Sequence, residues 1–143
     1  MKKITFLLAT LLCASAVFAQ SDESAVVSTK KHKIVIQLTS NDTVVQKSVI
    51  KQLNNILRAA PNTKIEVVCH NNGLTFLQTA TTKQADNIRA LSARGVDFVA
   101  CENTMRDRKV KREDLLGACR IVPAGVVEIM LKQEKKWAYL KAG

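Results

Sequence analysis

Short β-branched runs alternate with segments of helical periodicity along this chain of 143 residues. The runs predict strands at residues 33–38, 65–69, 96–101, 120–122 and 137–140. Helices are predicted at residues 45–60, 83–94 and 126–135, and two short helical turns in residues 105–116. Strands that alternate with helices form a mostly parallel sheet with helices on both faces. The order of elements therefore predicts a three-layer α/β/α fold.

The beginning of the first long helix carries a capping signal. Residues 39–42 are rich in side chains that cap helices, and Thr43 and Gln46 have the spacing of a capping box. This spacing predicts that the side chains of Thr43 and Gln46 bind the first backbone N–H groups of the helix.

The first residues of the chain follow the pattern of a secretory signal peptide. Lys2 and Lys3 form a basic start, residues 4–17 are nearly all apolar, and Val17-Phe18-Ala19 supplies the small residues of a cleavage site. The apolar run is too short for a spanning helix, which needs about 20 residues, and this argues against an uncleaved anchor. We therefore expect residues 1–19 to be cleaved as a signal peptide, before Gln20.

Cleavage would leave a short tether and one domain. Residues 20–31 are polar and small and predict a flexible tether, whereas residues 32–143 have the size of an ordinary single domain. Leu12 before Cys13 does not suit lipidation, so Cys13 should leave with the signal. The expected location is periplasmic or secreted, with no membrane attachment after cleavage.

The chain is strongly basic, with 22 Lys and Arg residues against 12 Asp and Glu residues. A basic surface attracts nucleic acid, anionic lipid or small anions. Export argues against nucleic acid, and an aromatic content of 4% leaves no platform for stacking bases. A small anion or an acidic protein partner remains, and so does the alternative that the surface is simply a solvated basic one.

Three cysteines remain after cleavage: Cys69, Cys101 and Cys119. Their odd number leaves at least one thiol unpaired within a subunit. Cys69 and Cys101 end predicted strands, whereas Cys119 lies at the entrance of one and should be at the opposite edge of the sheet. A strand of five residues spans roughly 16 Å, and disulfide Cα atoms lie within about 7 Å. A Cys101–Cys119 disulfide is therefore not expected, but Cys69 and Cys101 could be neighbours.

Cys101 is the candidate catalytic residue. The carboxyl ends of strands in open α/β sheets are where ligands bind, and a thiol there can act as a nucleophile or a sulfur carrier. A buried, inert thiol is the alternative. Glu102 disfavours the thiolate by its charge, whereas Arg106 and Arg108 favour it. His70 could orient or activate Cys101, or serve only as a hydrogen-bonding loop residue.

The residues that we expect around a ligand at this edge are His70, Asn72, Gly73, Asn103, Thr104 and Arg106. The spacing of Cys69, His70 and Cys101 matches no zinc pattern, so we predict no metal. No phosphate-binding or dinucleotide-binding glycine loop is present, and we predict no cofactor. The basic run 106–112 could hold an anion beside Cys101, or it could be a solvated loop.

Several phrases of the sequence resemble the DsrE/DsrF-like family, in particular its exported, single-domain branch. They are Gly95-Val96-Asp97-Phe98-Val99-Ala100-Cys101-Glu102-Asn103-Thr104, then Val122-Pro123-Ala124-Gly125-Val126-Val127-Glu128-Ile129, then Gln133 with Trp137-Ala138-Tyr139-Leu140. The similarity runs from about His32 to the C-terminus. It implies a small α/β fold with a largely parallel five-stranded sheet and assembly into homotrimers or hexamers.

The resemblance also implies a kind of chemistry. In the sulfur-oxidation and thiouridine-relay members, a cysteine carries persulfide sulfur between proteins. Residues 79–87, where those members place that cysteine, contain none here, and Cys101 matches the strand-end cysteine of the exported branch instead. The loop after the second strand reads His70-Asn71-Asn72-Gly73, where relatives often have His-Gly-x-Gly.

These observations lead to two hypotheses. The first is an exported sulfur-relay or thiol- and persulfide-binding protein in which Cys101 bears the sulfur, with a sulfur donor or acceptor protein, or a small anion, as its partner. The second is a non-catalytic ligand-binding or structural oligomeric module with an inert Cys101. The sequence establishes no reaction class for an enzyme. Residues 126–131 are apolar nearly all round the predicted helix, so we expect a homo-oligomer.

Overall fold

Five parallel strands form the centre of the computed structural model, which describes residues 26–142. The strands are β1 (His32–Leu38), β2 (Thr63–Cys69), β3 (Asp97–Cys101), β4 (Cys119–Val122) and β5 (Ala138–Ala142). Their order across the sheet is β4-β3-β2-β1-β5, and every neighbouring pair is parallel. The predicted α/β fold with a parallel five-stranded sheet is confirmed. The predicted signal peptide and the first part of the tether lie outside the described residues.

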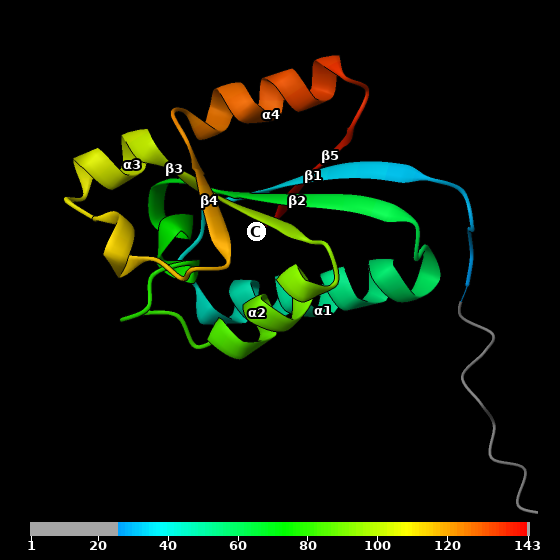
Figure 1. The fold of residues 1–143 in the computed structure, drawn as a ribbon, viewed down its shortest axis with the longest axis horizontal. Coiled ribbons are helices and arrows are strands. Elements are labelled where there is room, and N and C mark those ends of the chain that lie inside the picture. The colour runs from blue at the N-terminus through cyan, green and yellow to red at the C-terminus, as the bar shows by residue number, and fades with distance from the viewer. Residues whose placement is uncertain (1–25, 143) are drawn as a thin grey trace, which may run out of the picture.

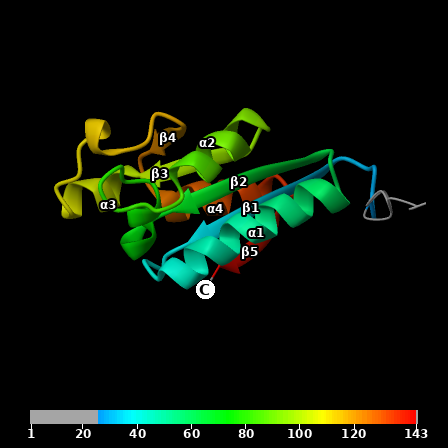
Figure 2. The same cartoon turned by 90° about the horizontal axis from the view of Figure 1, so that it is seen from below.

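Helices cover both faces of this sheet. Helices α1 (Thr43–Ala59) and α2 (Ala85–Ala93) lie on one face, and α4 (Gly125–Glu134) lies on the other (Figures 1 and 2). Helix α3 (Glu102–Asp107) follows β3 at the carboxyl edge. Two 3-10 helices, η2 (Asn71–Phe76) and η3 (Arg112–Asp114), complete the loops. All parallel strands end at the edge where α3 and α4 begin, which positions the candidate site.

The cap of α1 differs from the predicted capping box. Asp42 precedes the helix, and its carboxylate accepts a hydrogen bond of 2.7 Å from the N–H of Val44. The side chain of Gln46 is buried and donates instead to the hydroxyl of Thr75, at 3.1 Å. Asp42 is the better cap because its short side chain reaches the second helical N–H group directly.

The two faces of the sheet bury very different amounts of apolar surface. The face under α1 and α2 holds the large core, which includes Phe76, Phe98, Leu53, Leu74 and Leu91. The face under α4 holds a small cluster of Val35, Val68, Val99, Val122 and Ile129, with Trp137 packed against it. Helix α4 is therefore attached to the sheet by few apolar contacts.

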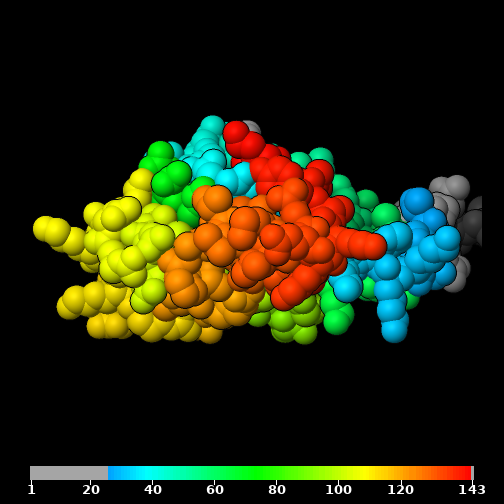
Figure 3. Space-filling model, turned by 90° about the horizontal axis from the view of Figure 1, so that it is seen from above, coloured from blue at the N-terminus to red at the C-terminus, as the bar shows by residue number. Residues whose placement is uncertain are grey.

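Helix α4 also presents apolar side chains to the outside. It covers the centre of its face of the molecule, and its outer surface is unobstructed (Figure 3). The exposed apolar side chains of this helix are Val126, Val127, Met130 and Leu131. We refer to these four residues as the outer α4 surface.

The segment before β1 lies against the end of α1. The N–H groups of Val27 and Ser28 donate to the carbonyl of Ala59, at 2.7 and 3.0 Å. The side-chain amide of Asn62 donates to the carbonyl of Thr29 at 2.7 Å.

Across residues 26–142, no helix has the length and apolar character needed to cross a membrane.

Candidate functional site

Cys101 stands at the end of β3 and is the N-cap residue of α3. Its side chain points to the α4 face of the sheet, where the N–H of Gly125 donates to Sγ at 3.2 Å. The thiol therefore lies where two helices begin. Backbone N–H groups at helix starts lack partners within the helix and are free to bind an anion. The residue is 5% exposed.

Hydrogen bonds favour the thiolate form of Cys101. Burial alone would raise the pKa of this thiol, but hydrogen bonds from Thr104, Gly125 and Asn103 outweigh burial and lower the pKa below its usual value. Thr104 contributes both its N–H and its hydroxyl. The same hydroxyl accepts a hydrogen bond from the N–H of Asn71 at 3.1 Å, which leaves its proton free to point at the sulfur.

Arginine charges are not among the main causes of this pKa shift, contrary to our expectation for Arg106 and Arg108. The guanidinium of Arg106 donates to the side chain of Asn103 and pairs with Glu102 at 3.4 Å. The guanidinium of Arg108 donates to the side chain of Asn72. These partners hold both arginines on the outside of the loops.

The other two cysteines lie on the opposite face of the sheet. In the register of β2 and β3, Cys69 is paired with Ala100, one residue before Cys101, so its side chain faces the α1 side. Strands β2 and β3 are adjacent, but the two thiols that could have been neighbours lie on opposite faces of the sheet, because adjacent residues of a strand point to opposite faces. Cys119 begins β4 on the α1 side, and all three thiols are free. Burial raises the pKa of both Cys69 and Cys119.

His70 shares the α4 face with Cys101. An imagined Cβ on Gly125 would lie 3.2 Å from the Cβ of Cys101 and 3.4 Å from that of His70, so both residues flank this glycine. The side-chain amide of Gln37 donates to Nε2 of His70 at 2.7 Å, and the hydroxyl of Tyr139 donates to the Gln37 carbonyl oxygen. Because the amide nitrogen of Gln37 can only donate, Nε2 of His70 must accept, and the neutral ring therefore carries its proton on Nδ1.

Burial lowers the pKa of His70, and this shift predicts a pH-dependent stability. The unfolded chain takes up a proton on this residue below about pH 6.5, whereas the folded chain does so only at lower pH. The free energy of unfolding should therefore fall as the pH is lowered from 7 to 5.5. Denaturant titrations across this range should show a smaller pH dependence for His70→Gln. The wild-type pH dependence should persist in His32→Gln, and an unchanged slope in His70→Gln would contradict the prediction.

The remaining predicted site residues have distinct positions. Asn103 and Thr104, in the first turn of α3, donate hydrogen bonds to the thiol of Cys101. Asn72 and Arg106 lie on the outer side of the loops. Gly73 lies against the end of β1: an added Cβ would be 2.0 Å from the carbonyl oxygen of Leu38. The structure thus brings Cys101, Asn103 and Thr104 together and gives Gly73 a packing role.

Sequence reasoning missed Gly125, Gln37 and Tyr139 as members of this site. Gln37 is the single amide in a β-branched strand, and this departure from the apolar pattern was a signal for a buried polar contact. Gly125 follows the fourth strand at the edge where Cys101 was expected. In the part of the chain from residue 26 to 142, no three His, Cys, Asp or Glu side chains are grouped as metal ligands.

The fold and the site together describe a small α/β protein with a strand-end cysteine. The thiol lies at the carboxyl end of an inner strand of a parallel sheet, and N–H groups at the start of two helices donate to it. The model of the DsrE/DsrF-like family matches residues 25–142, and the chain belongs to this family.

A solved structure supports the same fold. MTH1491 from Methanobacterium thermoautotrophicum, described as a protein of unknown function, is 27% identical to this chain and superimposes with a TM-score of 0.74. The match covers 77% of this chain and 98% of MTH1491. No curated protein matches the chain.

Proposed function

We propose that this chain binds and carries sulfur on Cys101, as a thiol- or persulfide-binding protein of a sulfur relay. The observation that supports this proposal is the set of hydrogen bonds on Sγ, which lowers the pKa of the thiol despite its burial. Because the thiolate is the nucleophilic form of cysteine, this environment favours attack on sulfur. The family to which the chain belongs adds support, since some members relay sulfur.

The proposed step is a transfer of sulfane sulfur. The Cys101 thiolate attacks the outer sulfur of a donor persulfide, a new S–S bond forms on Cys101, and the donor's S–S bond breaks. The donor leaves as a thiolate, and the proton of its outer sulfur stays on the new persulfide. An acceptor thiolate then attacks the outer sulfur of Cys101 in the same way. Each time, hydrogen bonds from Gly125 and Thr104 stabilise the thiolate form of Cys101.

We also propose the partners of this step. The donor or acceptor is an acidic protein, or a small anion, because basic side chains surround the loops at the edge that holds Cys101. These side chains, all exposed, are Arg106, Arg108, Lys109 and Lys111. Electrostatic attraction of this kind speeds encounter and falls with ionic strength.

Assembly and location are proposed on separate grounds. We propose a homo-oligomer, a trimer or a hexamer, that buries the outer α4 surface. The exposure of Val126, Val127, Met130 and Leu131 supports this proposal. We propose that residues 1–19 direct export and are removed, so that the mature chain begins at Gln20 in the periplasm or outside the cell. The composition of residues 1–19 supports this.

The second candidate function is a ligand-binding or structural module in which Cys101 is inert. The observation that favours it is the small exposure of Cys101, 5%, which is close to the 4% of Cys119. Because the two residues are similarly exposed, a large difference in the reactivity of their thiols would point to a difference in ionisation.

Mass spectrometry of protein treated with inorganic polysulfide tests the proposal. We expect the Cys101 peptide to gain one sulfur atom, Cys101→Ser to lose this gain, and Cys119→Ser to retain it. At neutral pH, the rate of alkylation of Cys101 should exceed that of Cys119 by about tenfold or more, as a larger thiolate fraction requires. Absence of sulfur on Cys101, with equally slow alkylation of both thiols, would favour the inert module.

The predicted cleavage has a separate test. The intact mass of exported protein should match a chain that starts at Gln20, and a mass that includes residues 1–19 would refute the cleavage.

A further inference from the structure

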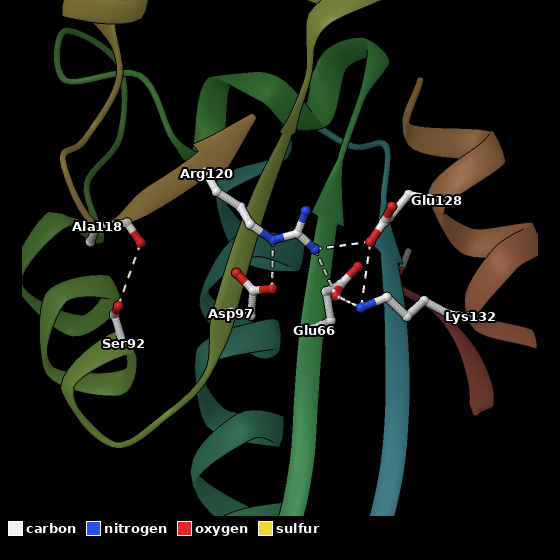
Figure 4. A network of polar contacts seen from close by, with 7 residues as sticks. All are labelled: Glu66, Ser92, Asp97, Ala118, Arg120, Glu128 and Lys132. Atoms are coloured by element: carbon white, nitrogen blue, oxygen red, sulfur yellow. Dashed lines mark hydrogen bonds and ion pairs between the residues drawn. The ribbon is translucent and has the colours of Figure 1, made fainter. Parts of the chain in front are cut away.

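A cluster of charged side chains lies between the sheet and α4 (Figure 4). Three of its members are acidic and two are basic: Glu66 on β2, Asp97 on β3, Glu128 on α4, Arg120 on β4 and Lys132 on α4. Four elements of the fold thus meet in one ionic network. This network lies on the same face of the sheet as Cys101, but closer to the amino ends of the strands.

Arg120 and Lys132 link the three carboxylates. The guanidinium of Arg120 donates to Asp97 at 2.7 Å, and to Glu66 and Glu128 at 2.9 Å each. The ammonium of Lys132 pairs with Glu66 and lies 3.4 Å from Glu128. The same ammonium stands 4.5 Å from the centre of the Trp137 ring. Both residues contributed by α4 are therefore tied to the side chains of the sheet.

Glu66 is the buried centre of the cluster. Its side chain is 1% exposed, and its Oε1 atom is buried without a hydrogen-bond partner. Burial raises the pKa of Glu66, although Lys132 and Arg120 oppose this shift. A buried ionic network is weak support for stability, because well-packed apolar residues of similar volume are often as stable. A role in fixing a particular geometry is the better-supported use of such a network.

The geometry that this network can fix is that of α4. Only Gly125 and Ile129 of this helix are buried, so one apolar side chain and the ionic contacts of Glu128 and Lys132 attach it to the sheet. The first residue of the same helix is Gly125, whose N–H donates to Cys101. Glu128 lies one helical turn from Gly125. A shift of α4 would therefore change the distance between this N–H and the thiol.

We propose that Glu66, Glu128 and Lys132 are positioning residues for Cys101, which hold α4 so that the N–H of Gly125 reaches the sulfur. The inference rests on the proposed role of Cys101 as the sulfur-bearing thiol. Its tests, however, read the position of α4 and the ionisation of the thiol, and they do not require sulfur transfer.

The pH profile of Cys101 alkylation separates this positioning role from simple electrostatics. Removal of the negative charge of Glu128 would, by relief of charge repulsion alone, favour the thiolate and lower the pKa of Cys101. Loss of the Gly125 hydrogen bond acts in the opposite direction. We expect Glu128→Ala to move the midpoint of the profile to higher pH and to slow alkylation at neutral pH by about tenfold, the effect of one hydrogen bond to a charged group. Glu134→Ala, the same change on the exposed side of α4, should leave the profile unchanged.

A second variant and a second measurement complete the test. Glu66→Gln keeps the shape of the side chain and should shift the profile in the same direction as Glu128→Ala. Hydrogen exchange at the Gly125 amide should be faster in both variants than in Glu134→Ala, because this N–H would lose its sulfur acceptor. A folded variant whose Cys101 midpoint stays in place or falls would overturn the positioning role. If polysulfide fails to load Cys101 while these shifts occur, the proposed function fails and the positioning role stands.

Discussion

Gly73→Ala should destabilise the domain by about 3 kcal/mol or more, the upper range for forced overpacking. An added Cβ would lie 2.0 Å from the carbonyl oxygen of Leu38, 2.6 Å from its carbon and 3.0 Å from the Cα of Thr39. All three atoms belong to the backbone, so no side chain can rotate away. The end of β1 and the loop that carries His70 would have to separate, which would also disturb the Cys101 site.

Denaturant unfolding measures this effect, and the chain contains a matched control. Gly117→Ala introduces the same methyl group at a position where no heavy atom beyond the adjacent residues lies within 4 Å of the new carbon. It should change the free energy of unfolding by less than about 0.5 kcal/mol. Similar stabilities of Gly73→Ala and Gly117→Ala would show that the loop after β2 does not pack against β1 as described.

The second large effect concerns assembly. At micromolar concentration, light scattering should give the wild type a mass of three or six chains. A stable contact buries about 800 Å² on each partner around an apolar centre, and the outer α4 surface offers such a centre. Met130→Glu places a charge within it and should reduce the mass to that of one chain, because an unpaired buried charge opposes association.

A matched substitution on another helix serves as the control. Val44 is an exposed apolar residue on α1, so Val44→Glu adds the same charge away from the outer α4 surface and should keep the oligomer. A monomeric wild type would contradict the assembly itself. A monomer produced equally by Val44→Glu would mean that the contact is not centred on α4.

Much of the fold could be predicted because its local signals agree with its architecture. The β-branched runs at residues 33–38 and 65–69 correspond closely to β1 and β2, and the cysteine after Ala100 does end an inner strand. The last helix was expected to be apolar all round, and four of its apolar side chains are indeed exposed. The spacing of apolar residues along the sequence reveals these features, because this spacing follows which side chains of a strand or helix are buried.

The site was harder to predict because it depends on which face each side chain takes. Cys69 and Cys101 both end strands, but a register offset of one residue places them on opposite faces of the sheet. No local pattern shows this offset. Gly125 contributes a backbone N–H, which leaves no chemical signature in a sequence. Glu66 is an acid inside an apolar strand, a signal that our sequence analysis did not use, and its partners are as distant in the sequence as Lys132.

The separation of the thiols by the sheet has a consequence for oxidative damage. A sulfenic acid on Cys101 is normally rescued when a second thiol condenses with it to form a disulfide. Cys69 and Cys119 lie behind the sheet, under α1 and α2, and cannot serve as that second thiol without unfolding. Repair of an oxidised Cys101 must therefore come from a thiol outside its own domain, whether a small molecule or another protein.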